Sequence, residues 1–178
     1  MLKKTIALIF ALVLCFSMCG CAGKEKGNEE QGGTAPDPVP AGNDTFSFKT
    51  TDLEGNTVSF SDYSSCKLIL VNMWEPWCGP CIAEMPDLEL LYEKYAEEGF
   101  MILGVFGNDT DVNARQTVEN LGITYPVLHA NADFNSLESG YVPTSAFFDA
   151  EGNMLNSQLI IGYKSSEEWE ELVKEYLG

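Results

Sequence analysis

Residues Trp74–Cys81 read Trp-Glu-Pro-Trp-Cys-Gly-Pro-Cys and form the most informative segment of the chain. It follows an almost continuous apolar run, residues 67–73, which is typical of a strand buried on both faces. Apolar residues at helical spacing begin at Ile82, directly after it. Two cysteines with this spacing at a helix start can close a small disulfide ring, and the helix dipole favours the thiolate of the first. We therefore predict that Cys78 is the attacking nucleophile and that Cys81 is the resolving thiol.

The segments around this motif alternate between strand and helix patterns. Apolar and polar residues alternate before the motif and predict a hairpin with its turn at residues 53–56. Further on, Gly122 ends one helical pattern, and Ser165 with Glu168 forms a capping box before another. The expected strands are residues 46–48, 57–60, 67–73, 101–107, 125–129, 145–149 and 154–161, and the expected helices are residues 82–99 (kinked at Pro86), 111–121 and a last one after Ser165. This alternation predicts an α/β fold, with a central mixed sheet and helices on both faces.

The Trp-Cys-Gly-Pro-Cys motif between strand and helix, with a later Val142-Pro143-Thr144, resembles the thioredoxin fold. The resemblance runs from about Thr45 to the C-terminus and implies a thioredoxin-like three-layer fold with an N-terminal β-hairpin extension. It also implies a cis peptide bond before Pro143, packed against the disulfide. Val142 and Pro143 are then expected to face the substrate.

The residues beside Cys78 complete the expected substrate-facing surface. Gly79 and Pro80 lie between the two cysteines of the thioredoxin-type motif, and Trp77 directly precedes it. Because an aromatic side chain next to a reactive sulfur offers a large contact area, we expect Trp77 to border the substrate groove.

Within this fold, the chain is similar to the membrane-anchored TlpA/ResA-like group of extracytoplasmic thiol-disulfide oxidoreductases. The similarity rests on a lipoprotein-like start, the hairpin before the central strand and the sequence Glu84-Met85-Pro86. Cytoplasmic thioredoxins have a buried Asp six positions before the first cysteine, where this chain has Asn72, which cannot titrate. Glu84 follows Cys81 by three residues on the same helical face, so a partly buried carboxylate there could accept the Cys81 proton. This matches the acidic residue used by the ResA-like group; the alternative is a solvated first-turn glutamate.

Other residues near the motif have simpler expected roles. Glu75-Pro76 departs from the Trp-Ala-Ser/Thr-Trp-Cys pattern of the resembled group, and we expect the charge to disfavour a thiolate and very acidic clients. Trp74 is expected to be a packing residue. Cys66 is expected to be a small buried hydrophobe, and His129, the single histidine, to be structural or exposed.

The N-terminus has the pattern of an export signal with a lipid anchor. Lys3 and Lys4 precede the apolar run Ile6–Leu14, and Gly20 precedes Cys21 as in a bacterial lipobox. We therefore expect residues 1–20 to be a lipoprotein signal peptide and residues 21–44 to be the lipidated Cys21 with a flexible linker, before a domain at residues 45–178. The expected location is the outer face of the bacterial cytoplasmic membrane. Cleavage by ordinary signal peptidase and a stop-transfer anchor are the alternatives.

Charge and composition exclude some classes of function. The chain has 178 residues, with Lys+Arg 10 against Asp+Glu 27 and a formal net charge of -17. Such a chain repels polyphosphate, and no basic stripe offsets this, so nucleic acid is excluded as a partner. A zinc site needs four ligands, which one Cys-x-x-Cys pair and one distant histidine do not supply. No metal or separate cofactor is expected besides the redox-active disulfide.

The resemblance implies an extracytoplasmic protein-disulfide reductase. Its expected partners are client proteins with disulfides, such as apocytochrome c or methionine sulfoxide reductase, and a membrane thiol-reductant donor of the CcdA/DsbD type. The direction is inferred from Cys-Gly-Pro-Cys, because thioredoxin-type sites lie near about −270 mV and oxidants of the DsbA type near about −120 mV. The alternatives are a disulfide donor with the same site, a Sco-like copper-binding chaperone, and a peroxiredoxin, which needs an activating arginine where this chain has only Arg115.

Overall fold

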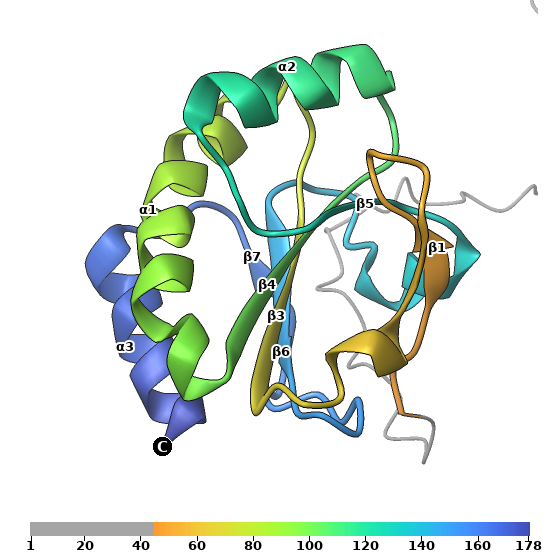
Figure 1. The fold of residues 1–178 in the computed structure, drawn as a ribbon. Coiled ribbons are helices and arrows are strands. Elements are labelled where there is room, and N and C mark those ends of the chain that lie inside the picture. The colour runs from red at the N-terminus through yellow and green to blue at the C-terminus, as the bar shows by residue number, and fades with distance from the viewer. Residues whose placement is uncertain (1–44) are drawn as a thin grey trace, which may run out of the picture. The chain divides into compact units, whose positions relative to one another are not determined.

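The computed structural model describes residues 45–178, whose strands form a small and a large sheet (Figure 1). The small sheet pairs β1 (Lys49–Thr51) with β2 (Thr57–Ser59) in antiparallel fashion. The large sheet has the strand order β5-β4-β3-β6-β7 and consists of β3 (Leu68–Met73), β4 (Phe100–Phe106), β5 (Val127–His129), β6 (Thr144–Phe148) and β7 (Ile160–Ile161). The helices are α1 (Gly79–Tyr95), α2 (Asp111–Leu121) and α3 (Ser166–Leu177), with short 3-10 helices η1 (Phe60–Tyr63), η2 (Ala96–Glu98) and η3 (Ala132–Leu137).

The central strand is β3, as its apolar run predicts. It pairs in parallel with β4 and antiparallel with β6, so the large sheet is mixed. Leu68 and Leu70 pack into the cluster on one face and Ile69 and Val71 into the cluster on the other. All four side chains are fully buried, which explains why the strand lacks the alternation of a half-exposed strand.

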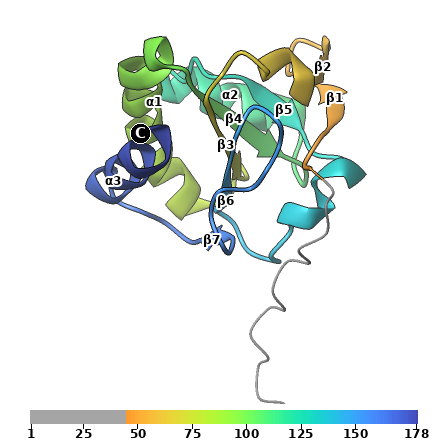
Figure 2. The same cartoon turned by 90° about the horizontal axis from the view of Figure 1, so that it is seen from below.

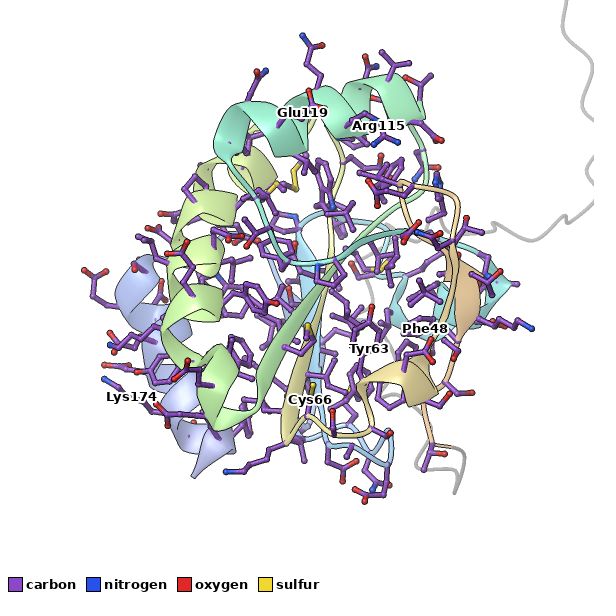
Figure 3. The ribbon with its side chains drawn as sticks, viewed as in Figure 1. Phe48, Tyr63, Cys66, Arg115, Glu119 and Lys174 are labelled. Atoms are coloured by element: carbon purple, nitrogen blue, oxygen red, sulfur yellow. A yellow bond between two sulfur atoms is a disulfide. The ribbon has the colours of Figure 1, made fainter. Side chains whose placement is uncertain are left out.

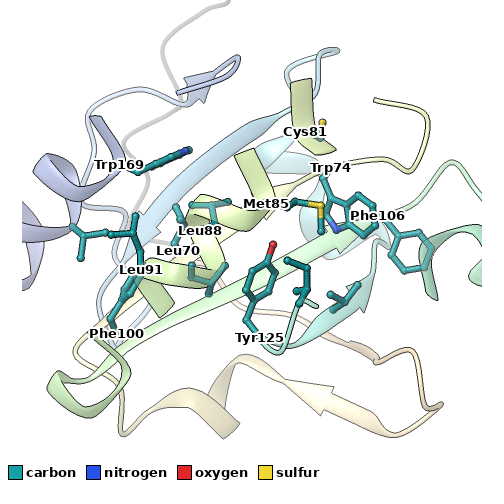
Figure 4. Close-up of a cluster of buried hydrophobic side chains, with 14 of the residues drawn as sticks. Leu70, Trp74, Cys81, Met85, Leu88, Leu91, Phe100, Phe106, Tyr125 and Trp169 are labelled. Atoms are coloured by element: carbon teal, nitrogen blue, oxygen red, sulfur yellow. The ribbon is translucent and has the colours of Figure 1, made fainter. Parts of the chain in front are cut away.

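One face of the large sheet is covered by α1 and α3 (Figures 1 and 4). Met85 and Leu88 of α1 pack in one cluster with Leu70 of β3, and Trp169 of α3 belongs to the same cluster. The buried side chain of Ala114, on α2, packs in this cluster too. These contacts fix the position of α1 against the sheet, so that its first turn lies near the end of β3.

The opposite face is covered by the β1–β2 hairpin and the 3-10 helices η1 and η3 (Figure 2). Aromatic rings fill this layer: Phe48 stacks on Phe134 at 5.0 Å and Phe46 stacks on Phe148 at 4.4 Å between centroids. Phe48 points inward from the hairpin in Figure 3. The predicted α/β fold with a central mixed sheet, flanking helices and an N-terminal hairpin is confirmed, although the helices of this second face are short 3-10 turns. The first hairpin strand lies at Lys49–Thr51 and not at the expected residues 46–48.

The expected strand over residues 154–161 is wrong for most of its length. Met154 forms one isolated bridge with Phe148, and strand pairing resumes only at β7. Between them the Asn156 side chain replaces a ladder partner: its Oδ1 accepts a hydrogen bond from the Phe147 N–H at 2.7 Å and its Nδ2 donates to the Gln158 carbonyl at 2.6 Å. A buried side-chain amide thus turns the chain away from β6.

Several element ends also differ from the expected ones. The strand expected at residues 125–129 begins at Val127, and Pro126 before it has no N–H for a ladder bond. The α1 helix begins earlier than expected, at Gly79, and continues through Pro86 to Tyr95. The helix stop at Gly122 and the capping box at Ser165 are confirmed.

The expected signal peptide, the Cys21 lipidation site and the linker lie outside the described residues. Within residues 45–178, no helix combines the length and the apolar character that crossing a membrane requires.

Gly152 offers a test of how the hairpin layer is attached. Its backbone carbonyl accepts the Phe46 N–H at 2.8 Å, and a Cβ at Gly152 would lie 2.2 Å from the Phe46 carbonyl oxygen. Gly55 has the same positive φ of 85° but open space around its missing Cβ. We expect Gly55→Ala to lower the free energy of unfolding by about 1 kcal/mol and Gly152→Ala by at least about 2 kcal/mol more, measured by urea denaturation. Equal losses in the two variants would contradict the close backbone approach at Gly152.

Candidate active site

The two cysteines of the motif form a disulfide at the N-terminus of α1 (Figure 3). Cys78 is the N-cap residue, and its Sγ accepts a hydrogen bond from the Cys81 backbone N–H at 3.2 Å. The Cα atoms are 5.3 Å apart, within the usual disulfide range. Cys78 keeps 4% of its surface exposed and Cys81 none, so Cys78 presents the sulfur that an incoming thiol or disulfide can reach. This asymmetry supports the predicted roles of nucleophile and resolving thiol.

The segment before β6 lies against this disulfide. The Val142–Pro143 peptide bond is cis, as expected, and the Val142 carbonyl oxygen lies 3.6 Å from Sγ of Cys78. The Pro143 carbonyl accepts the Gly162 N–H at 2.8 Å, and Thr144 Oγ1 donates to the Tyr141 carbonyl at 2.7 Å. These bonds fix the backbone next to the reactive sulfur on both sides of Pro143.

A groove of about 590 Å³ runs along this side of the disulfide. Trp77 and Tyr141 form exposed parts of its lining, with 65% and 72% of their surfaces accessible, and Val142 lines it as well. Gly79 and Pro80 are exposed beside Cys78 but do not line the groove. The expected client-facing roles of these residues stay predictions, and Tyr141, which directly precedes Val142, is a lining residue that the sequence analysis missed.

Trp74 is a packing residue, as expected, with 1% of its surface exposed. Its ring lies 5.9 Å from that of Phe106 in the cluster below the disulfide (Figure 4). Gly104 makes room for it, since a Cβ there would lie 3.2 Å from Trp74 Nε1.

Glu84 lies fully buried on α1, one helical turn beyond Cys81. Its Oε1 accepts a hydrogen bond from Asn72 Nδ2 at 3.0 Å, and its Oε2 accepts the Lys164 backbone N–H at 3.2 Å. Burial raises the pKa of Glu84 from its ordinary value of 4.5 to about 7, against the opposing effects of these donors and of the nearby Trp169 indole N–H, which lies outside normal hydrogen-bond geometry. The solvated first-turn glutamate is therefore excluded, and the carboxyl can exchange a proton near neutral pH.

Glu75 is placed differently from expectation. It is only 2% exposed, and its Oε1 accepts hydrogen bonds from the backbone N–H groups of Gly107 and Asn108 at 3.0 and 2.8 Å and from Asn108 Nδ2 at 3.1 Å. The carboxylate is thus fixed to the loop after β4 and does not lie free beside Cys78. Asn108, which holds it there, has no signal in the sequence that points to the site.

The remaining candidate residues lie elsewhere. Cys66 is half-buried, has no disulfide partner within residues 45–178, and burial raises its thiol pKa. His129 Nε2 lies 3.7 Å from Asp111, and no cluster of metal-ligating side chains occurs in the described part of the chain. Arg115 on α2 (Figure 3) donates to the Leu53 carbonyl and to Glu54 at the hairpin turn, so it does not serve Cys78 as a peroxidatic arginine would.

Comparisons with known proteins agree with this geometry. Residues 41–156 match the model of the AhpC/TSA family. The chain is 30% identical over 174 residues to the thiol-disulfide oxidoreductase ResA of Bacillus thuringiensis subsp. konkukian (strain 97-27), which covers 96% of this chain and 97% of that protein. It is 29% identical over 171 residues to ResA of Geobacillus kaustophilus, covering 95% and 91%.

A solved structure shares both the fold and part of the sequence. The thiol:disulfide interchange protein of the thioredoxin family from Chlorobium tepidum TLS superposes with a TM-score of 0.66 at 30% identity, covering 83% of this chain and all of that one. The thioredoxin-like fold inferred from the motif is thereby confirmed.

The buried carboxyl of Glu84 predicts a pH dependence of stability. Folding raises its pKa from 4.5 to about 7, so the folded protein keeps a proton in this window that the unfolded chain releases. The contribution of Glu84 to the free energy of unfolding therefore falls by on the order of 3 kcal/mol as the pH rises from 4.5 to about 7, and it is constant above that pH. Glu84→Gln is expected to remove this slope in urea unfolding of the oxidised protein between pH 4 and pH 8. A stability difference between the two proteins that is the same at every pH would contradict the assignment.

Proposed function

The chain belongs to the AhpC/TSA family of thioredoxin-fold proteins and is a thiol-disulfide oxidoreductase, and from this premise we propose that it reduces disulfides in client proteins outside the cytoplasmic membrane. The observation that carries the proposal is the placement of Cys78. Its sulfur lies at a helix N-terminus, 3.6 Å from the Val142 carbonyl and beside an open groove, while its partner Cys81 is fully buried.

The reaction transfers two electrons from the dithiol to the client. The Cys78 thiolate attacks one sulfur of the client disulfide, the S–S bond breaks, and the other client sulfur leaves as a thiolate that takes up a proton. The Cys81 thiol then loses its proton and attacks Cys78 Sγ in the mixed disulfide. The second client thiolate leaves and is protonated, and the Cys78–Cys81 disulfide remains.

Glu84 is the proposed acceptor of the Cys81 proton. Its pKa of about 7 lets it take up a proton near neutral pH, which an ordinary exposed glutamate does poorly. The carboxyl is buried on the same helix as Cys81 and is shielded from bulk water. The proposed proton transfer from the Cys81 thiol therefore needs no direct contact with the solvent.

The direction, location and donor belong to the same proposal. A Cys-Gly-Pro-Cys site favours reduction, and the lipobox-like Gly20-Cys21 supports anchoring outside the membrane. That compartment is oxidising, so a membrane thiol-reductant donor of the CcdA/DsbD type is needed to reduce the disulfide again. Apocytochrome c and methionine sulfoxide reductase are the client classes expected from the resemblance.

The reduction potential tests the direction. We expect a midpoint well below about −220 mV when the protein is equilibrated with glutathione and dithiothreitol buffers and the Cys78–Cys81 pair is followed by mass. A midpoint near about −120 to −150 mV would mean that the protein donates disulfides, and the proposed direction would be wrong.

A trapping experiment serves as the control for the site itself. Cys81→Ser is expected to accumulate a mixed disulfide between Cys78 and a client peptide, while Cys78→Ser accumulates none. Copper titration of the reduced protein checks the Sco-like alternative, since tight stoichiometric binding would favour a metal-delivery role.

The role of Glu84 can be measured separately. We expect Glu84→Gln to slow resolution of the mixed disulfide by at least about tenfold at pH 7 and to remove an inflection near pH 7 from the rate profile. Glu93→Gln, a change at an exposed carboxylate on the same helix, is the matched control. Unchanged resolution and unchanged thiol titration in Glu84→Gln would remove Glu84 from the mechanism.

A further inference from the structure

Glu75 is a buried carboxylate of which only one oxygen is satisfied. Its Oε1 accepts three hydrogen bonds from Gly107 and Asn108, whereas its Oε2 is shielded from water and has no hydrogen-bond partner. Buried polar atoms are nearly always partnered, because leaving one unpaired costs free energy. The unpartnered Oε2 therefore distinguishes this side chain from an ordinary structural carboxylate.

The charge of Glu75 also has no counter-ion. The ion pairs among residues 45–178 join Lys94 and Lys174 to Glu170 and Arg115 to Glu54, and His129 lies 3.7 Å from Asp111. None of them involves Glu75. A buried carboxylate without a cation is costly, and the hydrogen bonds to Oε1 offset only part of that cost.

The groove beside the disulfide is the place from which a counter-ion can come. Glu75 lines it together with Trp77, Tyr141 and Val142, and no lysine or arginine contributes to its lining. The other carboxylate in the lining, Glu138, is exposed. Because Glu75 is only 2% exposed, its charge is weakly screened, and a cation in the groove interacts with it more strongly than with a surface carboxylate.

The position of the groove determines which part of a client enters it. Two lining residues are close to Cys78, since Trp77 precedes it in the chain and the Val142 carbonyl lies 3.6 Å from its sulfur, so the residues next to a client cysteine bonded to Cys78 would face this part of the groove. The exposed rings of Trp77 and Tyr141 add faces on which a cationic side chain can lie. An occupant with a positive charge is thus attracted by the buried carboxylate and can contact the exposed rings of Trp77 and Tyr141.

We propose that Glu75 is a specificity-determining residue, and that the groove takes a client segment with a lysine or arginine next to the cysteine that Cys78 attacks. The inference rests on the proposed disulfide reduction and specifies its substrate class. It extends the expectation that very acidic clients are disfavoured, by assigning this effect to the groove.

The test uses three disulfide-linked peptides that differ only in the residues flanking the cysteine, which are lysine, norleucine or glutamate. The reduced protein is mixed with each peptide, and second-order rate constants are followed by tryptophan fluorescence. We expect the lysine peptide to react roughly fivefold to tenfold faster than the norleucine peptide at low salt, and the glutamate peptide to react more slowly than both. In Glu75→Gln the ratio of the lysine rate to the norleucine rate is expected to fall below about twofold.

Glu119→Gln is the matched control, since it removes one negative charge from an exposed position on α2 (Figure 3), outside the groove. It is expected to keep the full lysine preference. If Glu75→Gln does not fold, the wild-type rates decide alone: equal rates for the lysine and norleucine peptides would overturn the proposal. A preference that persists in Glu75→Gln, or that disappears in Glu138→Gln instead, would overturn it as well. Failure to reduce any of the three peptides would overturn the proposed function itself.

Discussion

The burial of β3 between two paired neighbours is the constraint on which the site depends. Strand register places Met73, the last residue of β3, opposite Thr144, the first residue of β6. The segment after β3 and the segment before β6 therefore emerge at the same end of these strands. Cys78 follows one of these segments and Val142 precedes the other, which brings sulfur and carbonyl to 3.6 Å. The packing of α1 on β3 then directs the N-terminus of the helix toward that end of the strands. The pairing of the central strand and the packing of α1 on it together position the reactive sulfur.

Two buried carboxylates, Glu75 and Glu84, lie near the disulfide in different environments. Glu84 faces donors on both oxygens, yet burial still raises its pKa to about 7, which suits a group that exchanges a proton. Glu75 is fixed by three N–H donors on one oxygen and retains an unpartnered second oxygen, which suits a group that attracts a positive charge. The roles proposed for these two residues, proton transfer and client selection, thus follow from different environments of the same residue type.

The sequence predicts the parts of this arrangement that depend on local patterns. The apolar run of β3, the Cys-x-x-Cys spacing, the stop at Gly122 and the capping box at Ser165 each depend on neighbours in the chain, and they reappear in the structure. The short β7 depends on Asn156, whose amide bonds to Phe147 nine residues away, and periodicity carries no such information. The same holds for Glu75, since its partners at Gly107 and Asn108 come from the next loop in space. The burial of Glu84 depends on α3 and on the Lys164 backbone, which lie next to this carboxyl only in the assembled fold.

The attachment of the hairpin to β5 has a further consequence for how copies of this protein behave at high local concentration. Asp52 bridges to Leu128, and the Leu53 N–H donates to the Val127 carbonyl at 3.2 Å, so the hairpin occupies hydrogen-bonding groups along one outer strand of the large sheet. The other outer strand, β7, is only two residues long. Unpaired edge strands are where sheets of separate molecules join and aggregate. With one edge occupied and the other very short, the described domain resists strand exchange with its neighbours even when many copies crowd together.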